Sequence, residues 1–534
     1  MPNLVRSFTS ILFVIVGLLT VDSIVFAADS ICKVRIRVNG GDSNAARVQV
    51  VGSDGKSYAP ENVVLRKPKQ GGSYFYTHGD FTVSLPEGKS RIMVSRGLES
   101  EPKRVMLDVQ ENLDLDLRVD QWIDSRKLGW FSGDSHVHLH TGGPIKVSTK
   151  DTLIAAQAEG LNFVNLCVSN NVGNDIRDAN LITGKPHADS SKEHLLVFGE
   201  EMRSSIYGHM QFFGIKKLVE PQYTGFDNTP NHLDFPANYN MAAEAVRQGG
   251  VVTYGHPMFK NQQFPFGDDP SAGNAAAREL PIDAILNVAQ AIDLMSYNSD
   301  EDLSADLWYR LLNCGLKLSA CVGTDALLDR STDPMGGSRV YVNVAGSFNM
   351  KSWLEGLVAG RTFVTNGPIP RLTVNGTNVG GTTSMKRNGN VKVMIRVDSR
   401  VPFERTEVLM NGKVVSQRLM RNPGVNVPNR SHIHVQQYEL NVPIERSSWI
   451  ALRVRGADHE DVFDGPVWAH TSPVYVSVDA KPIRSVSDAK YFEEWIENLI
   501  RVVRVRNRYP SDKQRDEVIK LFRRAQTEFR KLAQ

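Results

Sequence analysis

The segment Gly-Asp-Ser-His-Val-His, which contains His136 and His138, is the most suggestive chemical motif of the sequence. Successive side chains of a β-strand alternate between its two faces, so His136, His138 and His140 are predicted to share one face. Two imidazoles placed in this way can bind one metal ion. A second pair, His432 and His434, has no acidic partners nearby in the sequence and is predicted to lie on a surface strand.

Further imidazoles and carboxylates occur at or just past the ends of predicted strands, namely Glu200, Glu201, His209, His256 and Asp325. In a barrel, the C-terminal ends of the parallel strands meet at one rim, where the active site lies. Borderline divalent ions such as zinc, manganese or iron take imidazole and carboxylate ligands together. The sequence therefore predicts a mixed nitrogen and oxygen metal site. Taken singly, each residue has a structural alternative, such as a solvated turn, a strand edge or a helix cap.

These residues are positioned by strands that alternate with helices between residues 126 and 370. Strands are predicted over 163–168, 195–199, 251–254, 292–297 and 316–323, and helices after Ser148 and over 240–247, 275–290 and 303–314. Such alternation predicts an α/β protein with a mostly parallel sheet or barrel. The 189 residues from His136 to Asp325 (325 − 136) are fewer than the roughly 250 of an eight-fold barrel, which favours a shorter barrel.

Segments rich in β-forming residues flank this region. Residues 28–125 and 371–482 are each predicted to form a β-sandwich, the second with a hairpin turn at Asn411-Gly412. Residues 483–534 are predicted to form a helical hairpin broken at Pro510. From residue 487 this tail carries a charge of +4, from 12 Lys and Arg minus 8 Asp and Glu. It could contact a membrane surface or an acidic glycan, but a hairpin docked on the body of the protein is the favoured interpretation.

The composition limits the classes of function. A chain of 534 residues, 41% hydrophobic and 23% charged, predicts a globular protein of about three domains. A net charge of +3 argues against a protein built around nucleic acid. The four cysteines are too few and scattered for a disulfide framework or a cysteine-rich zinc module. Residues 1–27 are predicted to be a Sec-type signal peptide cleaved after Ala27, because the apolar run is too short to span a bilayer, and this indicates a secreted or periplasmic protein without a membrane span.

Together these motifs resemble the polymerase and histidinol phosphatase (PHP) superfamily, and within it the CehA/McbA-type secreted metallohydrolases. The resemblance covers about residues 129–371 and rests on Gly-Asp-Ser-His-Val-His, Gly-Glu-Glu, Gly-His-Met, Gly-His-Pro, Gly-Thr-Asp and Thr-Asn-Gly-Pro-Ile-Pro-Arg. It implies a distorted seven-stranded βα barrel over residues 126–370. The ligands that it implies are His136, His138, Glu201, His209, His256 and Asp325.

Two positions depart from the pattern of this family. Asn171 stands where its second motif usually ends in a histidine, and Leu327 stands where its final motif usually carries one. We therefore expect one or two divalent ions rather than three.

The expected reaction is hydrolysis. A metal ion with an open position lowers the pKa of its bound water from about 15.7 to near 7, which yields a hydroxide nucleophile. Glu200, His140 or Asp134 could shuttle protons, and Arg203 or Lys260 could hold an anionic group of the substrate. The family resemblance implies an ester, carbamate or phosphoester bond, in a small-molecule or glycan-like substrate.

Two other classes of function are open from the sequence. The first is a catalytically degenerate barrel within an extracellular carbohydrate- or surface-binding protein, which the imidazoles missing at Asn171 and Leu327 favour and the six retained ligands oppose. The second is a surface-anchored assembly factor that uses the basic helical tail.

Overall fold

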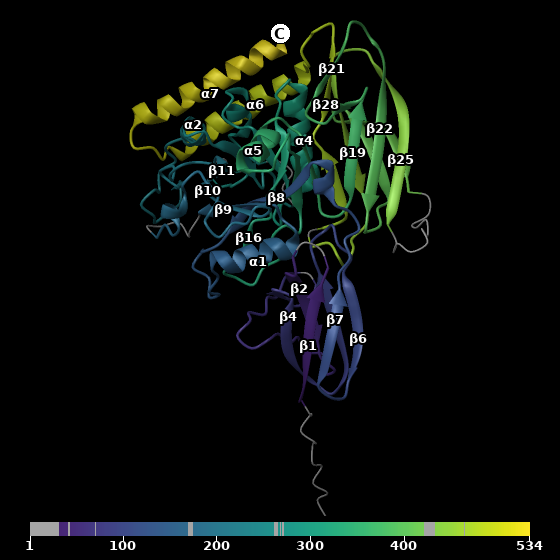
Figure 1. Cartoon of the computed structure of the whole chain (residues 1–534). Helices are drawn as coiled ribbons and strands as arrows, with labels where there is room; N and C mark the ends of the chain where they lie inside the picture. The colour runs from purple at the N-terminus through teal and green to yellow at the C-terminus, as the bar shows by residue number, and fades with distance from the viewer. Residues whose placement is uncertain are drawn as a thin grey trace, which may run out of the picture.

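The computed structural model describes residues 31–40, 43–69, 71–168, 175–260, 265–267, 269, 272–420, 433–463 and 465–534. Helices and strands both contribute, and the protein is a mixed α/β protein in which strands predominate (Figure 1). The predicted signal peptide, Asn171 and His432 lie outside the described residues. Among the helices of the described part, none is long and apolar enough to cross a membrane.

The N-terminal region consists of two sheets packed face to face. One contains β4 (Asp80–Pro86), β1 (Ile31–Asn39) and β7 (Leu113–Arg118), and the other contains β3 (Phe75–Thr77), β2 (Ala46–Val51), β5 (Gly88–Ser95) and β6 (Lys103–Val109). Along β1 the side chains alternate between exposed and buried. The apolar faces of both sheets, including Val34, Val48 and Ile92, meet in one core. This region lies below the rest of the molecule in Figure 1.

A curved sheet forms the centre of the molecule. Its strands follow one another in the order β8 (Trp130–His138), β9 (Phe163–Val168), β10 (Leu195–Ser204), β11 (Gly208–Phe213), β13 (Val251–Gly255), β14 (Ala291–Met295) and β15 (Ser319–Val322). Neighbouring strands are parallel except at β11, which runs antiparallel to both β10 and β13. The short β16 (Ala326–Leu327), directly after β15, pairs in parallel with β8. The last strand of the series therefore pairs with the first, β8, and closes the curved sheet.

Five helices accompany this sheet, namely α1 (Thr149–Glu159), α2 (Asn238–Arg247), α3 (Leu280–Ile285), α4 (Glu301–Asn313) and α5 (Met350–Val358). The helix predicted after Ser148 is confirmed, and Ser148 and Asp151 form a capping box at its start. The helix predicted over 275–290 is wrong in its extent, because only Leu280–Ile285 is helical. Pro281 fits only the first turn of a helix, and Asn287 ends the segment with a φ of 62°.

The C-terminal β-region shares a sheet with the barrel. The sheet β20 (Thr377–Asn378), β19 (Ile369–Val374), β22 (Gly389–Ser399), β25 (His434–Ile444) packs on a layer formed by β21 (Thr382–Met385), β23 (Arg405–Met410), β24 (Lys413–Leu419), β26 (Ser448–Arg455), β27 (Trp468–Thr471) and β28 (Val474–Val478). β27 pairs with β18 (Thr362–Thr365), which pairs with β17 (Arg339–Asn343), and β17 pairs with β8. Hydrogen bonding is thus continuous between the two regions. The predicted hairpin at Asn411-Gly412 is confirmed by the pairing of β23 with β24.

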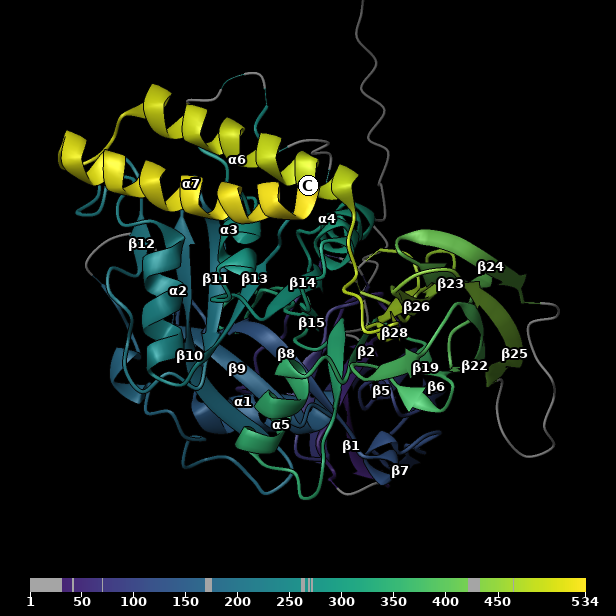
Figure 2. The ribbon, with the colours of Figure 1, turned by 90° about the horizontal axis from the view of Figure 1, so that it is seen from above.

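Two long helices, α6 (Val486–Arg506) and α7 (Asp512–Ala533), lie side by side over one side of the barrel region (Figure 2). Their apolar stripes, which include Phe492, Trp495 and Phe522, belong to the same core as the barrel strands. The indole Nε1 of Trp495 donates to the carbonyl oxygen of Arg278 at 2.7 Å. The tail predicted to be a helical hairpin is therefore built into the body of the protein.

Candidate metal centre

Six side chains from five strand ends and loops meet at one rim of the barrel, namely His136, His138, Glu201, His209, His256 and Asp325. The Nε2 atoms of His136 and His138 are 3.0 Å apart. Asp325 Oδ1 lies 3.2 Å from His138 Nε2 and 3.5 Å from His136 Nε2. All six donor groups predicted from the sequence are thus brought together.

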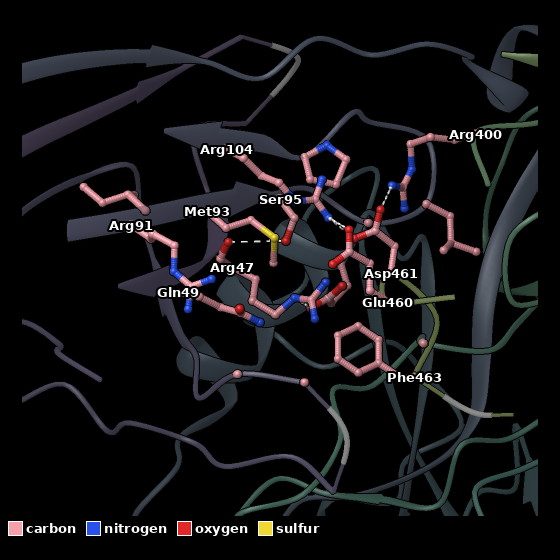
Figure 3. A pocket seen from close by; sticks show the side chains of 18 of the residues that line it. Arg47, Gln49, Arg91, Met93, Ser95, Arg104, Arg400, Glu460, Asp461 and Phe463 are labelled. Carbon is pink, nitrogen blue, oxygen red and sulfur yellow. Dashed lines mark hydrogen bonds and ion pairs between the residues drawn. The ribbon is translucent and has the colours of Figure 1, made fainter. Parts of the chain in front are cut away.

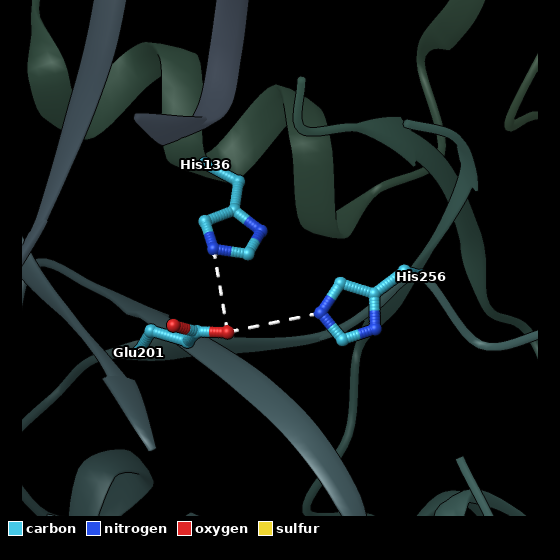
Figure 4. Close-up of side chains that lie close together, drawn as sticks. All are labelled: His136, Glu201 and His256. Carbon is cyan, nitrogen blue, oxygen red and sulfur yellow. Dashed lines mark ion pairs between the residues drawn. The ribbon is translucent and has the colours of Figure 1, made fainter. Parts of the chain in front are cut away.

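Glu201 is the carboxylate at the middle of this cluster. Its Oε1 lies 2.9 Å from His209 Nδ1 and 3.5 Å from His136 Nε2. The same oxygen is 3.7 Å from His256 Nε2, as Figure 4 shows for the side chains of His136, Glu201 and His256. The cluster contains two triads, and within each triad the potential ligand atoms all lie within 4.8 Å of one another. One triad is formed by His136, Glu201 and His256, and the other by His136, His138 and Asp325. The two triads share His136, and either could hold a metal ion.

Strand geometry explains most of this convergence. His136 and His138 project from the same face of β8 because they are two residues apart. Glu201 lies in β10, and His256 and Asp325 follow β13 and β15. His209 corrects the expectation that every donor follows the C-terminal end of a strand. It lies at the N-terminal end of β11, and it reaches the same rim because β11 is antiparallel to its neighbours.

The backbone is strained at two of the candidate ligands. His256 has a φ of 30° and Asp325 a φ of 61°, in the left-handed region that side chains other than glycine rarely adopt. Such a conformation costs about 1–3 kcal/mol at each residue and is concentrated at functional sites. Asp325 is held in place by its N–H, which donates to the His136 carbonyl oxygen at 2.8 Å. The Asn298 amide also donates to Asp325 Oδ2 at 3.1 Å.

The ring of His138 is arranged as a metal ligand requires. His138 Nδ1 lies 3.1 Å from the carbonyl oxygen of Cys167, which can only accept, so Nδ1 carries the proton and the Nε2 lone pair faces the cluster. The amide Nε2 of Gln211 donates to His136 Nδ1 at 3.0 Å and orients that ring with Nδ1 as the acceptor. His209 Nε2 and His256 Nδ1 are buried and have no hydrogen-bond partner within the described part of the chain. In His256 it is Nε2, 3.7 Å from Glu201 Oε1, that faces the cluster, and Nδ1 points away from it (Figure 4).

The two buried carboxylates of the cluster stabilise a positive charge between them. Burial opposes protonation of His136, but the carboxylates of Asp325 and Glu201 outweigh it and raise the pKa of His136 to about 9. Burial by itself would raise the pKa of both carboxyls, yet the charge of His136 holds the pKa of Glu201 and of Asp325 below the usual range. Burial lowers the pKa of His209 to about 4. A proton on His136 thus occupies the place where a divalent cation fits.

The three residues expected to shuttle protons do not join the cluster, which corrects that expectation. Asp134 is buried, and its oxygens accept hydrogen bonds from Thr324 and from the Gly336 N–H. Glu200 points to the opposite face of β10 from Glu201, where its Oε2 accepts from the Val219 N–H at 2.7 Å.

His140 also departs from the prediction that three histidines share one face. β8 ends at His138, so the two-residue alternation does not continue to His140. The His140 ring instead lies 2.8 Å from Asp178 Oδ2 and 2.8 Å from the Val147 carbonyl oxygen.

A cavity of about 560 Å³ opens onto the cluster. Arg203 lines it, with Nε 3.9 Å from Glu201 Oε2, whereas the predicted Lys260 is exposed and does not belong to the lining. Arg330 also lines the cavity and donates from Nε to Thr141 Oγ1 at 3.0 Å. Phe259 adds an aromatic wall, its ring centre 5.1 Å from that of His256.

Sequence reasoning missed Arg330, Phe259 and Asn298. Arg330 and Phe259 closely follow the ligands Asp325 and His256, and that proximity in sequence is the signal by which they could have been found. Leu327, at the position where the resembled family usually has a histidine, also lines the cavity.

Comparisons with known proteins add little to this geometry. No protein-family model and no curated protein matches the chain. Among solved structures, endonuclease Q in complex with a 27-mer duplex that carries an abasic lesion at the active site is 13% identical, with a TM-score of 0.26. The match covers 42% of this chain and 55% of that chain. A likeness of this size identifies neither the fold nor the function.

Proposed function

We propose that the protein is a metal-dependent hydrolase whose centre is the cluster at the barrel rim. The observation that carries the proposal is the meeting of four imidazoles and two carboxylates, contributed by five strand ends and loops, beside one cavity. This mixed donor set suits one or two ions of zinc, manganese or iron. Such an ion, when bound, would activate a water molecule and polarise the bond to be cleaved.

The residues around the cluster have separate tasks in this proposal. The Cys167 carbonyl fixes the tautomer of His138 and thereby presents its lone pair to the ion. Arg203 and Arg330 place two guanidinium groups at the cavity, where they would hold an anionic part of the substrate. Phe259 and Leu327 give part of the lining an apolar surface. This lining is compatible with an ester, carbamate or phosphoester bond in a molecule that carries negative charge.

We further propose that the curved sheet is the distorted seven-stranded barrel of the PHP superfamily, and that the protein is secreted or periplasmic. The order β8, β9, β10, β11, β13, β14, β15 and the return through β16 support the first part. The character of the first 27 residues supports the second.

The test combines metal quantitation with a substrate screen. The purified protein should contain a transition metal and hydrolyse some members of a panel of aryl esters, carbamates and phosphoesters. A double variant, His136→Ala with His138→Ala, should lose both the metal and the activity, whereas His140→Ala should keep the metal because His140 lies outside the cluster. Protein that is free of metal and cannot be reloaded would contradict the proposal.

A second candidate function is binding without catalysis, in a degenerate barrel. Leu327 favours it, because an apolar side chain lines the cavity where the resembled family has an imidazole. This candidate predicts binding to extracellular carbohydrate that survives complete removal of metal, together with no hydrolysis in the screen.

A further inference from the structure

A second cavity, of about 490 Å³, lies where the N-terminal β-region meets the barrel and the C-terminal β-region (Figure 3). Its floor is the outer face of β2, β5 and β6. Glu460, Asp461 and Phe463, from the loop between β26 and β27, form one wall, and Gly336 and Gly337 form another. It shares no lining residue with the cavity at the metal centre.

The alternation of side chains along three paired strands builds the floor of this cavity. Val48, Val50 and Ile92 point inward to the core of the sandwich, so their neighbours in sequence point outward. Two rows of outward side chains cross the sheet in register, namely Gln49, Met93 and Arg104 in one row and Val51, Arg91 and Met106 in the other. Polar and apolar groups thus alternate over the floor.

The lining carries an excess of positive charge. Five arginines (Arg47, Arg91, Arg104, Arg339 and Arg400) face three carboxylates (Glu159, Glu460 and Asp461), a net charge of +2. Asp461 pairs with both Arg104 and Arg400, at 2.5 Å and 2.6 Å. Arg339 donates to main-chain carbonyl oxygens rather than to a carboxylate. Arg91 has no ion-pair partner among the residues that the structure describes.

Arg47 adds a buried donor. Its residue is 7% exposed, its Nε lies 3.1 Å from Glu159 Oε1, and its guanidinium lies 4.4 Å from the ring centre of Phe463. Its Nη1 has no hydrogen-bond partner in the described ranges. A buried donor left unsatisfied costs about 1–3 kcal/mol, and more when it is charged. Arg47 also lines the cavity, so its guanidinium contributes to the positive charge there.

We propose that this cavity binds a small acidic saccharide, one or two rings in size, that carries a carboxylate or a sulfate. Guanidinium groups pair with such oxyanions through charge-assisted hydrogen bonds. Val51, Met93 and Phe463 supply apolar surface for a ring. The volume falls within the range of about 300–1,000 Å³ that is usual for small-molecule sites. A free acidic sugar and the terminal residues of an acidic polysaccharide share this chemistry.

Calorimetric titration of the whole chain as purified tests the proposal, with digalacturonate as the probe and lactose as a neutral probe of similar size. Digalacturonate should bind and lactose should not. Arg91→Gln should weaken binding of digalacturonate about tenfold or more, the equivalent of one charge-assisted hydrogen bond. Lys89→Gln is the matched control, because Lys89 lies two residues away on the same strand and face but outside the cavity, and it should change the affinity less than about twofold.

Met93→Glu is a second variant, which places a negative charge on the floor and should also weaken the binding. A titration with polygalacturonate distinguishes a free acidic sugar from the end of a polysaccharide as the natural occupant. If the occupant is the end of a polysaccharide, the polymer should also bind, through its chain ends. No binding of digalacturonate at about 10 mM, or equal binding by the Arg91 and Lys89 variants, would overturn the proposal. The double variant at His136 and His138 should bind digalacturonate normally, so the proposed hydrolase centre and this site can fail independently.

Discussion

The Nε2 atoms of His136 and His138 face each other at 3.0 Å inside the cluster. The proton of His138 is on Nδ1, where it is donated to the Cys167 carbonyl oxygen. His136 therefore has to be the donor between the two rings. The Nε2 atom that carries its proton lies 3.5 Å from Glu201 Oε1 and 3.5 Å from Asp325 Oδ1, where a cation would also be attracted.

Metal binding should therefore release a proton from His136. The pKa of His136 in the metal-free protein is about 9, so the ring is protonated at pH 7 and the ion has to displace that proton. We expect the affinity to rise roughly tenfold per pH unit from pH 7 and to level off above pH 9. Calorimetry in buffers of different ionisation enthalpy measures the release, about one proton for each first ion bound. An affinity independent of pH over this range would contradict this arrangement.

Two adjacent glutamates provide a matched pair of variants. Glu201→Gln removes the carboxylate that contacts four imidazoles and should lower metal affinity by about 100-fold or more, since loss of even an outer partner costs 10–100-fold. Glu200→Gln changes a residue on the opposite face of β10 and should leave the metal content unchanged. Elemental analysis after dialysis against a weak chelator measures both. Equal loss of metal in the two variants would show that the face assignment is wrong.

Glu200 should also make the stability of the protein depend on pH. Burial raises the pKa of Glu200 well above its usual range. A carboxyl whose folded pKa is raised contributes stability that is complete below its unfolded pKa, about 4.5, and is lost as the pH rises through the folded pKa. Glu200→Gln does not titrate, so the unfolding free energy of this variant should rise relative to that of the wild type between pH 5 and pH 8. Denaturant titrations at both pH values check this, and an unchanged difference would contradict a buried neutral carboxyl.

Arg330 should recognise negative charge on the substrate. Arg330→Gln should raise KM about tenfold for a substrate with an anionic group, because one charge-assisted contact is lost, and should leave kcat and the KM of a neutral ester nearly unchanged. Lys260→Gln is the control, since its exposed side chain does not line the cavity. A similar rise in KM for neutral and anionic substrates would show that Arg330 maintains the conformation of its loop rather than binding the substrate's charge.

The helical hairpin should be required for stability. Trp495 is 2% exposed and packs in the core shared with the barrel, so Trp495→Ala should cost about 3–5 kcal/mol of unfolding free energy. Glu494→Ala, on the exposed side of the same helix, should change it by less than about 0.5 kcal/mol. Removal of the hairpin would therefore disturb folding as a whole, and truncation is not a clean test of a localisation role for this segment.

The sequence predicted the donors better than their surroundings. His136, His138 and Glu201 could be identified because alternation in a strand is a local property that residue spacing records. The proton shuttles could not be identified in the same way. His140 is displaced because β8 ends two residues earlier, and the end of a strand depends on the neighbours with which it pairs.

Long-range pairing also explains what the sequence left out of the fold. The domain boundary predicted at residue 370 marks a real change from strand–helix alternation to strands alone. β18, before this boundary, nevertheless pairs with β27, about 100 residues later in the sequence. The residues of β18 do not by themselves indicate that partner. His209 was expected after a strand and is found at the beginning of one. The direction of β11 is fixed by β10 and β13 rather than by its own residues.

The left-handed backbone at His256 and Asp325 affects how this protein could be engineered. Glycine would relax both positions, so a search for variants that withstand heat would tend to collect glycine there and to delete two donors at once. Greater heat resistance would then be gained at the cost of ion binding. Any programme of laboratory evolution on this scaffold should therefore score retention of the ion together with thermal tolerance.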